Sequence, residues 1–260
     1  MEVIKNGIDV STHQGAIEWN RVETDFAIIR AGWSWYEGGM DIDKRFYENV
    51  SGAETNSIPF GVYLYAYDKT PESAKISARK LYDLIKAYKL QYPVIYDFED
   101  QQYLSNSKNS NTAICKAFLS ELESFGYYAM LYTYTNFADN YLNMDDLANY
   151  DFWVADYRGS VGYTGNYGIW QYSSKGEVAG INTPVDLNIS YKDYPSIIKN
   201  AGLNGFNIND SNLTQEDTES LIKQLESEIE KRKCAEAELS NLESIFSELK
   251  SKLKEFIDEY

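Results

Sequence analysis

Short apolar runs and amphipathic stretches alternate along the first 200 residues. Most of the apolar runs are almost continuously apolar, which is typical of strands covered on both faces. They predict strands at residues 7–11, 26–31, 59–66, 93–99, 127–133, 152–157, 168–172 and 185–188. Between them, apolar residues recur at helical spacing in residues 43–55, 71–90 and 111–125. This alternation predicts an α/β fold with a parallel sheet, and five strand–helix units followed by strands with little helix favour an irregular barrel.

The pattern changes after residue 200. Residues 201–213 are rich in Gly, Asn and Asp and predict a linker. Residues 215–260 contain neither Gly nor Pro, and apolar residues follow a heptad through residues 239–260. We therefore expect a barrel domain at 1–200, a linker at 201–213 and a helical tail at 214–260. The tail is either a coiled coil that joins copies of the chain or a helical hairpin packed on its own domain.

Composition narrows the class of protein. The net charge of -16 argues against a nucleic-acid partner and against electrostatic attachment to a membrane. No apolar segment approaches 18 residues, and the first residues lack the apolar core of a signal peptide. Cys115 and Cys234 lie far apart, so we expect no disulfide and a reducing compartment. These features predict storage in the cytoplasm.

Two carboxylates end one of the apolar runs. Asp97 and Glu99 are two residues apart, so on a strand their side chains share a face. Close carboxylates in a partly apolar place titrate apart, and one can stay protonated while the other stays charged. A protonated and a charged carboxyl group together can cleave a glycosidic bond. The alternative is a strand end with two solvated acids, because Asp-x-Glu occurs by chance in many proteins.

Several short motifs extend this picture. They are GIDVS at 7–11, HQG at 13–15, FAIIRA at 26–31, GVYLY at 61–65, DFE at 97–99, WVADY at 153–157, WQYSS at 170–174 and VDLN at 185–188. In this order and spacing the chain resembles the glycoside hydrolase family 25 lysozymes, a muramidase family found in many phage endolysins. The resemblance covers about residues 3–195. It implies an irregular, TIM-like (β/α) barrel, here with a C-terminal helical appendage, and a site at the carboxyl ends of the strands.

The resemblance also implies the reaction and its residues. The family hydrolyses the β-1,4 bond between N-acetylmuramic acid and N-acetylglucosamine in peptidoglycan, and its acidic positions fall on Asp9, Asp97, Glu99 and Asp186. We expect Glu99 to be the general acid, its pKa raised by repulsion from the other three carboxylates. Asp97 then stays charged and is a nucleophile or, as we favour, orients the substrate's own acetamido group. Asp9 and Asp186 are expected to maintain the charges and hydrogen bonds of the site or, alternatively, to cap turns of the barrel.

Aromatic residues near the strand ends are candidates for sugar contacts. They are Tyr63, Tyr65, Tyr132, Trp170 and Tyr172, and some must be core because alternate residues of a barrel strand face inward. Trp33 and Trp35 are expected at the rim. Where the family commonly has Tyr-His-Phe, this chain has Tyr-Leu-Tyr at 63–65, which puts the local polar contacts in doubt. His13 is expected to be a local hydrogen bonder, and no metal or cofactor is expected.

The leading hypothesis is a phage endolysin whose partners are peptidoglycan glycan strands. It would be stored in the host cytoplasm, released to the wall by a holin, and self-associate or target the wall through residues 214–260. A bacterial muramidase of wall turnover is the alternative enzyme. The alternative without catalysis is a peptidoglycan-binding or scaffolding protein on the same barrel.

Overall fold

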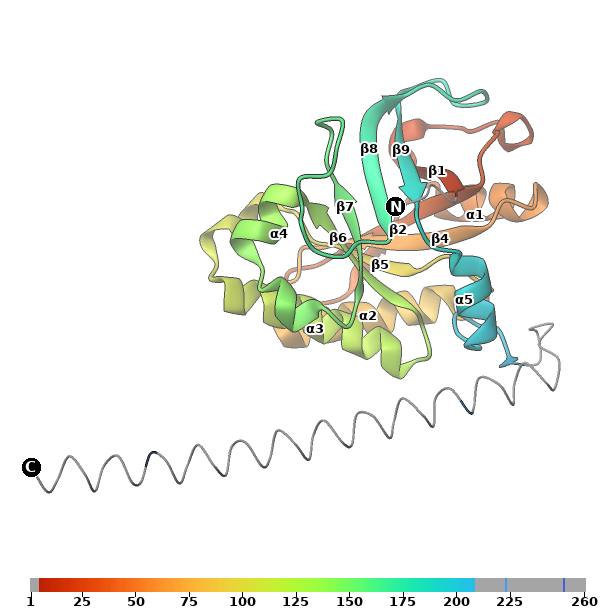
Figure 1. Cartoon of the computed structure of the whole chain (residues 1–260). Coiled ribbons are helices and arrows are strands. Elements are labelled where there is room, and N and C mark those ends of the chain that lie inside the picture. The colour runs from red at the N-terminus through yellow and green to blue at the C-terminus, as the bar shows by residue number, and fades with distance from the viewer. Residues whose placement is uncertain (1–4, 209–222, 224–249, 251–260) are drawn as a thin grey trace, which may run out of the picture. The chain divides into compact units, whose positions relative to one another are not determined.

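The structure is a computed structural model that describes residues 5–208, Lys223 and Lys250 (Figure 1). Contacts divide the chain into one compact unit at residues 1–211 and a second at 212–260. Lys223 and Lys250 are helical. The rest of the predicted tail at 214–260, with its coiled coil or hairpin and its self-association, lies outside the described residues.

Eight strands of the first unit close into a barrel (Figure 1). In order around the ring they are β1 (Lys5–Val10), β2 (Phe26–Ser34), β4 (Phe60–Tyr65), β5 (Val94–Asp97), β6 (Ala129–Tyr134), β7 (Asp151–Ala155), β8 (Ile169–Gly176) and β9 (Val185–Ser190). All neighbours are parallel except β9, which is antiparallel to both β8 and β1. The short β3 (Met40–Ile42) folds back on β2. The predicted α/β barrel is confirmed.

Helices cover the outside of the barrel. They are α1 (Phe46–Thr55), α2 (Pro71–Ile85), α3 (Lys108–Ser124), α4 (Thr135–Tyr141) and α5 (Tyr194–Asn200). The prediction of five strand–helix units was wrong, because β1 and β2 are joined only by the 3-10 turns η1 (Thr12–Gln14) and η2 (Trp19–Arg21). Gly15 ends η1 at a φ of 67°, where a helix cannot continue. Within the described residues, no helix combines the length and apolarity needed to cross a bilayer.

Two apolar layers explain the continuous apolar runs. One fills the barrel and includes Phe26, Ile28, Ile95, Met130 and Trp153. The other lies between the strands and the outer helices, and neighbouring strand residues such as Ala27, Ile29 and Leu131 belong to it. Because successive strand residues point to opposite faces, each central strand buries both faces.

The first part of the predicted linker belongs to the barrel unit. Asn204 is fully buried, and its side-chain Nδ2 donates to the carbonyl oxygens of Leu90 and Tyr92 at 3.1 and 2.9 Å. Its Oδ1 accepts from the backbone N–H of Tyr128 at 2.7 Å. Phe206 packs with the layer inside the barrel. Residues 201–208 therefore close the end of the barrel where β5 and β6 begin, and placing them in a linker was a wrong prediction.

Candidate active site

Four carboxylates come from strands that meet at one edge of the barrel. Parallel strands bring their last residues to the same edge, and β9 brings its first residues there because it runs the other way. Asp9 on β1 thus lies opposite Asp186 on β9. Asp97 is the last residue of β5, and Glu99 follows two residues later. The sequence prediction placed all four at strand ends, and the structure brings them together.

Asp97 and Glu99 share a face, as their spacing predicts. Phe98 between them points outward, where its ring stacks on Tyr103 at a centroid distance of 3.8 Å. Asp97 is buried, and its Oδ1 has no hydrogen-bond partner among the described residues. Glu99 is half-buried and lines a groove of about 840 Å³ that Asp186 also lines. Glu99 is therefore the member of the pair that a bound polymer can reach.

The pKa values of this pair are raised mainly by burial. Burial raises the pKa of Glu99 to about 7, with smaller contributions from Asp186 and Asp100. Repulsion from the other three acids, expected from the sequence, is thus the lesser cause. Burial also holds the pKa of Asp97 well above its usual range, helped by Glu99 and Asp9 and opposed by Arg30. Burial therefore favours the neutral form of Asp97, whereas a charged form was expected from the sequence.

Asp9 and Asp186 form a hydrogen-bonded pair. Burial, and then the charge of Asp186, raise the pKa of Asp9 well above its usual range. Asp9 Oδ2 accepts from Gln171 Nε2 and from Asn188 Nδ2, each at 2.8 Å. Burial raises the pKa of Asp186 too, while its bond to Asp9 and the nearby His13 lower it. Both pKa values are raised, so the pair resists carrying two negative charges.

Gln171 is a functional candidate that sequence reasoning missed. Its Oε1 accepts from the hydroxyls of Tyr132 and Tyr157 at 2.9 and 2.6 Å. Two donors at the oxygen fix the orientation of the amide, so that Nε2 must face Asp9. A signal was present in the sequence, because Gln171 sits inside the WQYSS motif between the two aromatics that were chosen instead.

The predicted sugar-binding aromatics lie in four different places. Tyr132 lines the groove, whereas Tyr63 is buried inside the barrel against Trp153, with centroids 6.3 Å apart. Tyr65 is half-buried beside the acids, and its hydroxyl donates to Asp100 Oδ2 at 3.3 Å. Trp170 and Tyr172 are on the face of β8 opposite Gln171, and Trp170 packs against the outer apolar layer. The structure does not bring these last two residues to the acids.

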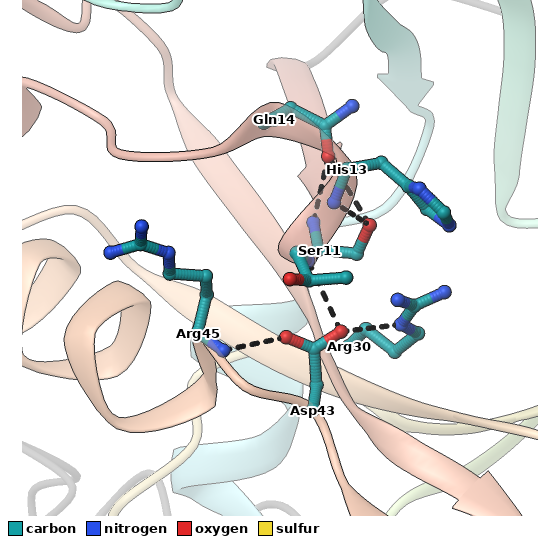
Figure 2. A network of polar contacts seen from close by, with 7 residues as sticks. Ser11, His13, Gln14, Arg30, Asp43 and Arg45 are labelled. Carbon is teal, nitrogen blue, oxygen red and sulfur yellow. Dashed lines mark hydrogen bonds and ion pairs between the residues drawn. The ribbon is translucent and has the colours of Figure 1, made fainter.

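Arg30 is a second candidate that sequence reasoning missed. It is held by the buried Asp43, whose Oδ2 accepts from Arg30 Nε at 2.7 Å and from the Thr12 backbone N–H at 3.1 Å (Figure 2). The positive charge of Arg30 favours the ionised form of Asp97. His13 takes part in the same network through its backbone N–H, which donates to Ser11 Oγ at 3.2 Å (Figure 2).

The far wall of the groove carries a cation. Arg158 lines the groove and binds Asp156 through two nitrogens, Nε to Oδ1 at 2.8 Å and Nη2 to Oδ2 at 2.6 Å. Asp156 also accepts from Thr135 Oγ1 and from the backbone N–H of Gly162. These donors, Arg158 first, hold the pKa of Asp156 well below its usual range. Asp156 thus stays charged and fixes the guanidinium at the wall.

Substitution of Gln171 tests the network around Asp9. Gln171→Leu should destabilise the protein by about 2–4 kcal/mol, since it leaves the buried Tyr132 hydroxyl, the more exposed Tyr157 hydroxyl and one carboxylate oxygen short of a partner. It should also lower kcat more than it raises KM, because Asp9 loses a donor that fixes the orientation of its carboxyl group. Tyr157→Phe removes one bond of the network and should have a smaller effect on both. Urea denaturation and kinetics on soluble glycan strands measure the two effects, and equal effects in the two variants would contradict this role.

The site can therefore supply a protonated carboxyl group at neutral pH, a second and more deeply buried acid, and a rigid polar floor. Within residues 5–208, no group of three or more His, Cys, Asp or Glu side chains is arranged to hold a metal ion. Two neighbouring acids that differ in burial, at the edge of a barrel, are suited to acid–base cleavage of a glycosidic bond.

Comparison with known proteins agrees with this chemistry. The YegX protein of Escherichia coli K12 is 30% identical over 199 residues, which cover 71% of this chain and 68% of YegX. The autolytic lysozyme of Clostridium acetobutylicum is 27% identical over 186 residues, which cover 70% of this chain and 54% of that enzyme.

A solved structure shows the same likeness. The modular autolysin LytC of Streptococcus pneumoniae superposes with a TM-score of 0.65 at 29% identity, over 72% of this chain and 46% of LytC. This chain thus matches less than half of that protein, which has also been solved with a synthetic peptidoglycan ligand. The sequence model of glycosyl hydrolases family 25 matches residues 8–181. The chain belongs to glycosyl hydrolases family 25 and is a glycoside hydrolase.

Proposed function

We propose that this chain hydrolyses the β-1,4 bond between N-acetylmuramic acid and N-acetylglucosamine in peptidoglycan. The observation that carries the proposal is that Glu99, two residues after the buried Asp97, lines the groove and has its pKa raised by burial to about 7. A lysozyme and an autolysin among the similar proteins support peptidoglycan as the substrate. Host lysis by a phage and wall turnover by a bacterium both use this reaction, and the phage setting stays a prediction.

Glu99 is the general acid in this proposal. Its half-buried position lets its proton reach the bridging oxygen of a strand in the groove. A pKa near the working pH keeps the acid protonated without making it a poor donor. As the bond from muramic acid C1 to that oxygen breaks, Glu99 gives its proton to the leaving N-acetylglucosamine.

Asp97 orients the acetamido group of muramic acid. Its buried Oδ1, which has no partner within the described part of the chain, is suited to accept the acetamido N–H. That bond and Arg30 both favour the charged form of Asp97 once substrate is bound. The acetamido oxygen then attacks C1. In the second step water attacks C1, the bond from C1 to the acetamido oxygen breaks, and the Glu99 carboxylate takes the proton of the water, which restores the acid.

The role of Asp97 can be separated from direct attack. Glycan strands that lack the acetyl group on muramic acid should be cleaved at least about a hundredfold more slowly if the acetamido group is the nucleophile, because an intramolecular nucleophile is lost. A covalent glycosyl ester on Asp97, trapped on such strands and seen by mass spectrometry, would instead show direct attack.

The pH profile tests the assignment of Glu99. kcat/KM should fall as the pH rises through about 7, because the proton on Glu99 is lost. Asp100 helps to raise this pKa, so Asp100→Asn should move the alkaline limb to lower pH. The variant keeps an oxygen that can accept from the Gln102 backbone N–H, as Asp100 Oδ1 does. An alkaline limb that stays in place in Asp100→Asn would contradict the assignment.

A further inference from the structure

A second cavity lies beside the acids, on the other side from the groove. This aromatic pocket has a volume of about 310 Å³ and is lined by Trp33, Ser34, Trp35, Tyr36, Glu37 and Tyr67. It is formed by the hairpin between β2 and β3 and by the loop after β4. Trp35 and Tyr36 are 49% and 47% exposed, so about half of each residue is open to solvent.

The hairpin holds these rings in fixed positions. The Trp35 backbone N–H donates to the Gly39 carbonyl at 3.1 Å, and the Trp35 ring lies so close to Gly39 that an added Cβ would be 2.8 Å from it. The ring of Tyr36 has Tyr67 at one edge, with centroids 6.1 Å apart, and Lys69 Nζ over its face at 3.9 Å. Rings held in this way lose little freedom when a ligand binds.

Buried polar bonds tie both walls of the pocket to the barrel. Asp68, which is fully buried, accepts from the hydroxyls of Ser77 and Tyr96, each at 2.7 Å. Ser77 Oγ in turn accepts from the Gly39 backbone N–H at 3.1 Å. On the other wall, Ser34 Oγ accepts from the Tyr67 backbone N–H at 2.7 Å. The pocket is therefore a preformed feature, although its rings are exposed.

Tyr67 and Tyr65 connect the aromatic pocket to the acids. The ring of Tyr67 lies 5.1 Å from that of Tyr65, which pairs with Asp97 across β4 and β5. Around the barrel, β2 and β4 carry the aromatic pocket and β5 carries the acid pair. The next strands, β6 and β7, carry most of the groove. The groove and the pocket thus flank Asp97 and Glu99.

We propose that the aromatic pocket binds a further sugar ring of the same glycan strand, on the opposite side of the acid pair from the groove. The inference rests on the proposed function, because it makes the enzyme hold sugars on both sides of the bond it cleaves. Flat aromatic faces suit the C–H faces of a pyranose, and the Glu37 carboxylate can accept from hydroxyl or acetamido groups at the edge of the sugar. The pocket then favours long strands over short fragments.

Kinetics on strands of defined length test this proposal. The substrates are glycan strands freed of stem peptides, from tetrasaccharide to decasaccharide. Tyr36→Ala and Trp35→Ala should each raise KM about tenfold on the long strands, leave kcat nearly unchanged, and leave the shortest cleavable strand unaffected. Tyr47→Ala is the matched control, since Tyr47 is a similarly exposed tyrosine on α1, and it should match the native chain at every length. Equal melting temperatures would confirm that the variants fold.

Other outcomes distinguish a failure of the pocket proposal from a failure of the proposed function. If the native chain cleaves long strands and the pocket variants keep its KM, the pocket proposal is wrong while the function stands. If the native chain cleaves none of the strands, the proposed function is wrong. In that case calorimetry measures whether the decasaccharide binds. The pocket proposal is overturned if the native chain does not bind it, or if Tyr36→Ala binds it as tightly as the native chain does.

Discussion

Glu99→Gln is expected to reduce cleavage of peptidoglycan by about 10²–10⁴-fold while making the protein more stable at alkaline pH. The loss follows because the amide has no acidic proton to give to the leaving oxygen. The gain follows from the raised pKa, since burial penalises the charged form of Glu99. One substitution should thus move activity and stability in opposite directions.

The pH dependence of the stability gain has a definite sign. The pKa of Glu99 rises from 4.5 for the free side chain to about 7 in the folded protein. Between these values the folded state binds more protons than the unfolded state, so the free energy of unfolding falls as the pH rises. At pH 8 the full cost of roughly 3 kcal/mol is present, and at pH 4 it is absent.

Urea denaturation at pH 4 and pH 8 measures this difference. Glu99→Gln should match the native chain at pH 4 and exceed it at pH 8, whereas the exposed Glu54→Gln on α1 should change neither value by more than about 0.5 kcal/mol. A variant that loses activity without gaining stability at pH 8 would mean that Glu99 ionises without cost. Full activity in Glu99→Gln would remove Glu99 from the role of general acid.

Asn204→Ala is expected to destabilise the barrel by about 3–5 kcal/mol, although the residue is far from the acids along the chain. The alanine would remove three side-chain hydrogen bonds and leave buried partners on residues 90, 92 and 128 unsatisfied, each at a cost of about 1–3 kcal/mol. Asn204 also has a φ of 55°, a conformation that asparagine tolerates better than alanine.

Two companion variants separate these causes. Asn204→Gly relieves the backbone and should recover only the smaller part of the loss. Asn200→Ala, at the exposed last residue of α5, should stay within about 0.5 kcal/mol of the native chain. Urea denaturation monitored by tryptophan fluorescence compares the three. Similar stabilities for Asn204→Ala and Asn200→Ala would contradict the view that residues 201–208 close the barrel.

The acid pair was predictable from the sequence because its signals agree. An apolar run predicts β5, and the two-residue spacing of Asp97 and Glu99 places both side chains on one face. Parallel strands then bring Asp9 to the same edge. What the sequence does not show is how deeply each carboxylate is buried, and burial is what raises both pKa values.

The two aromatic residues predicted on β8 do not line the site, for a different reason. Trp170 and Tyr172 were chosen because aromatic rings suit sugars, but the pleat of the strand decides which residues face inward. A shift of one residue exchanges the two faces, and Gln171 is the inward residue. Asn204 illustrates the same limit, because Gly- and Asn-rich segments look alike whether they link domains or close one.

The most direct test of the proposed reaction is the identity of the new reducing ends that the native chain releases from purified peptidoglycan. The digest is reduced with borohydride, hydrolysed and analysed by mass spectrometry. Cleavage by a muramidase leaves N-acetylmuramic acid at the new ends, so we expect its reduced alcohol. Reduced N-acetylglucosamine instead, or new peptide amino groups without new reducing ends, would contradict it.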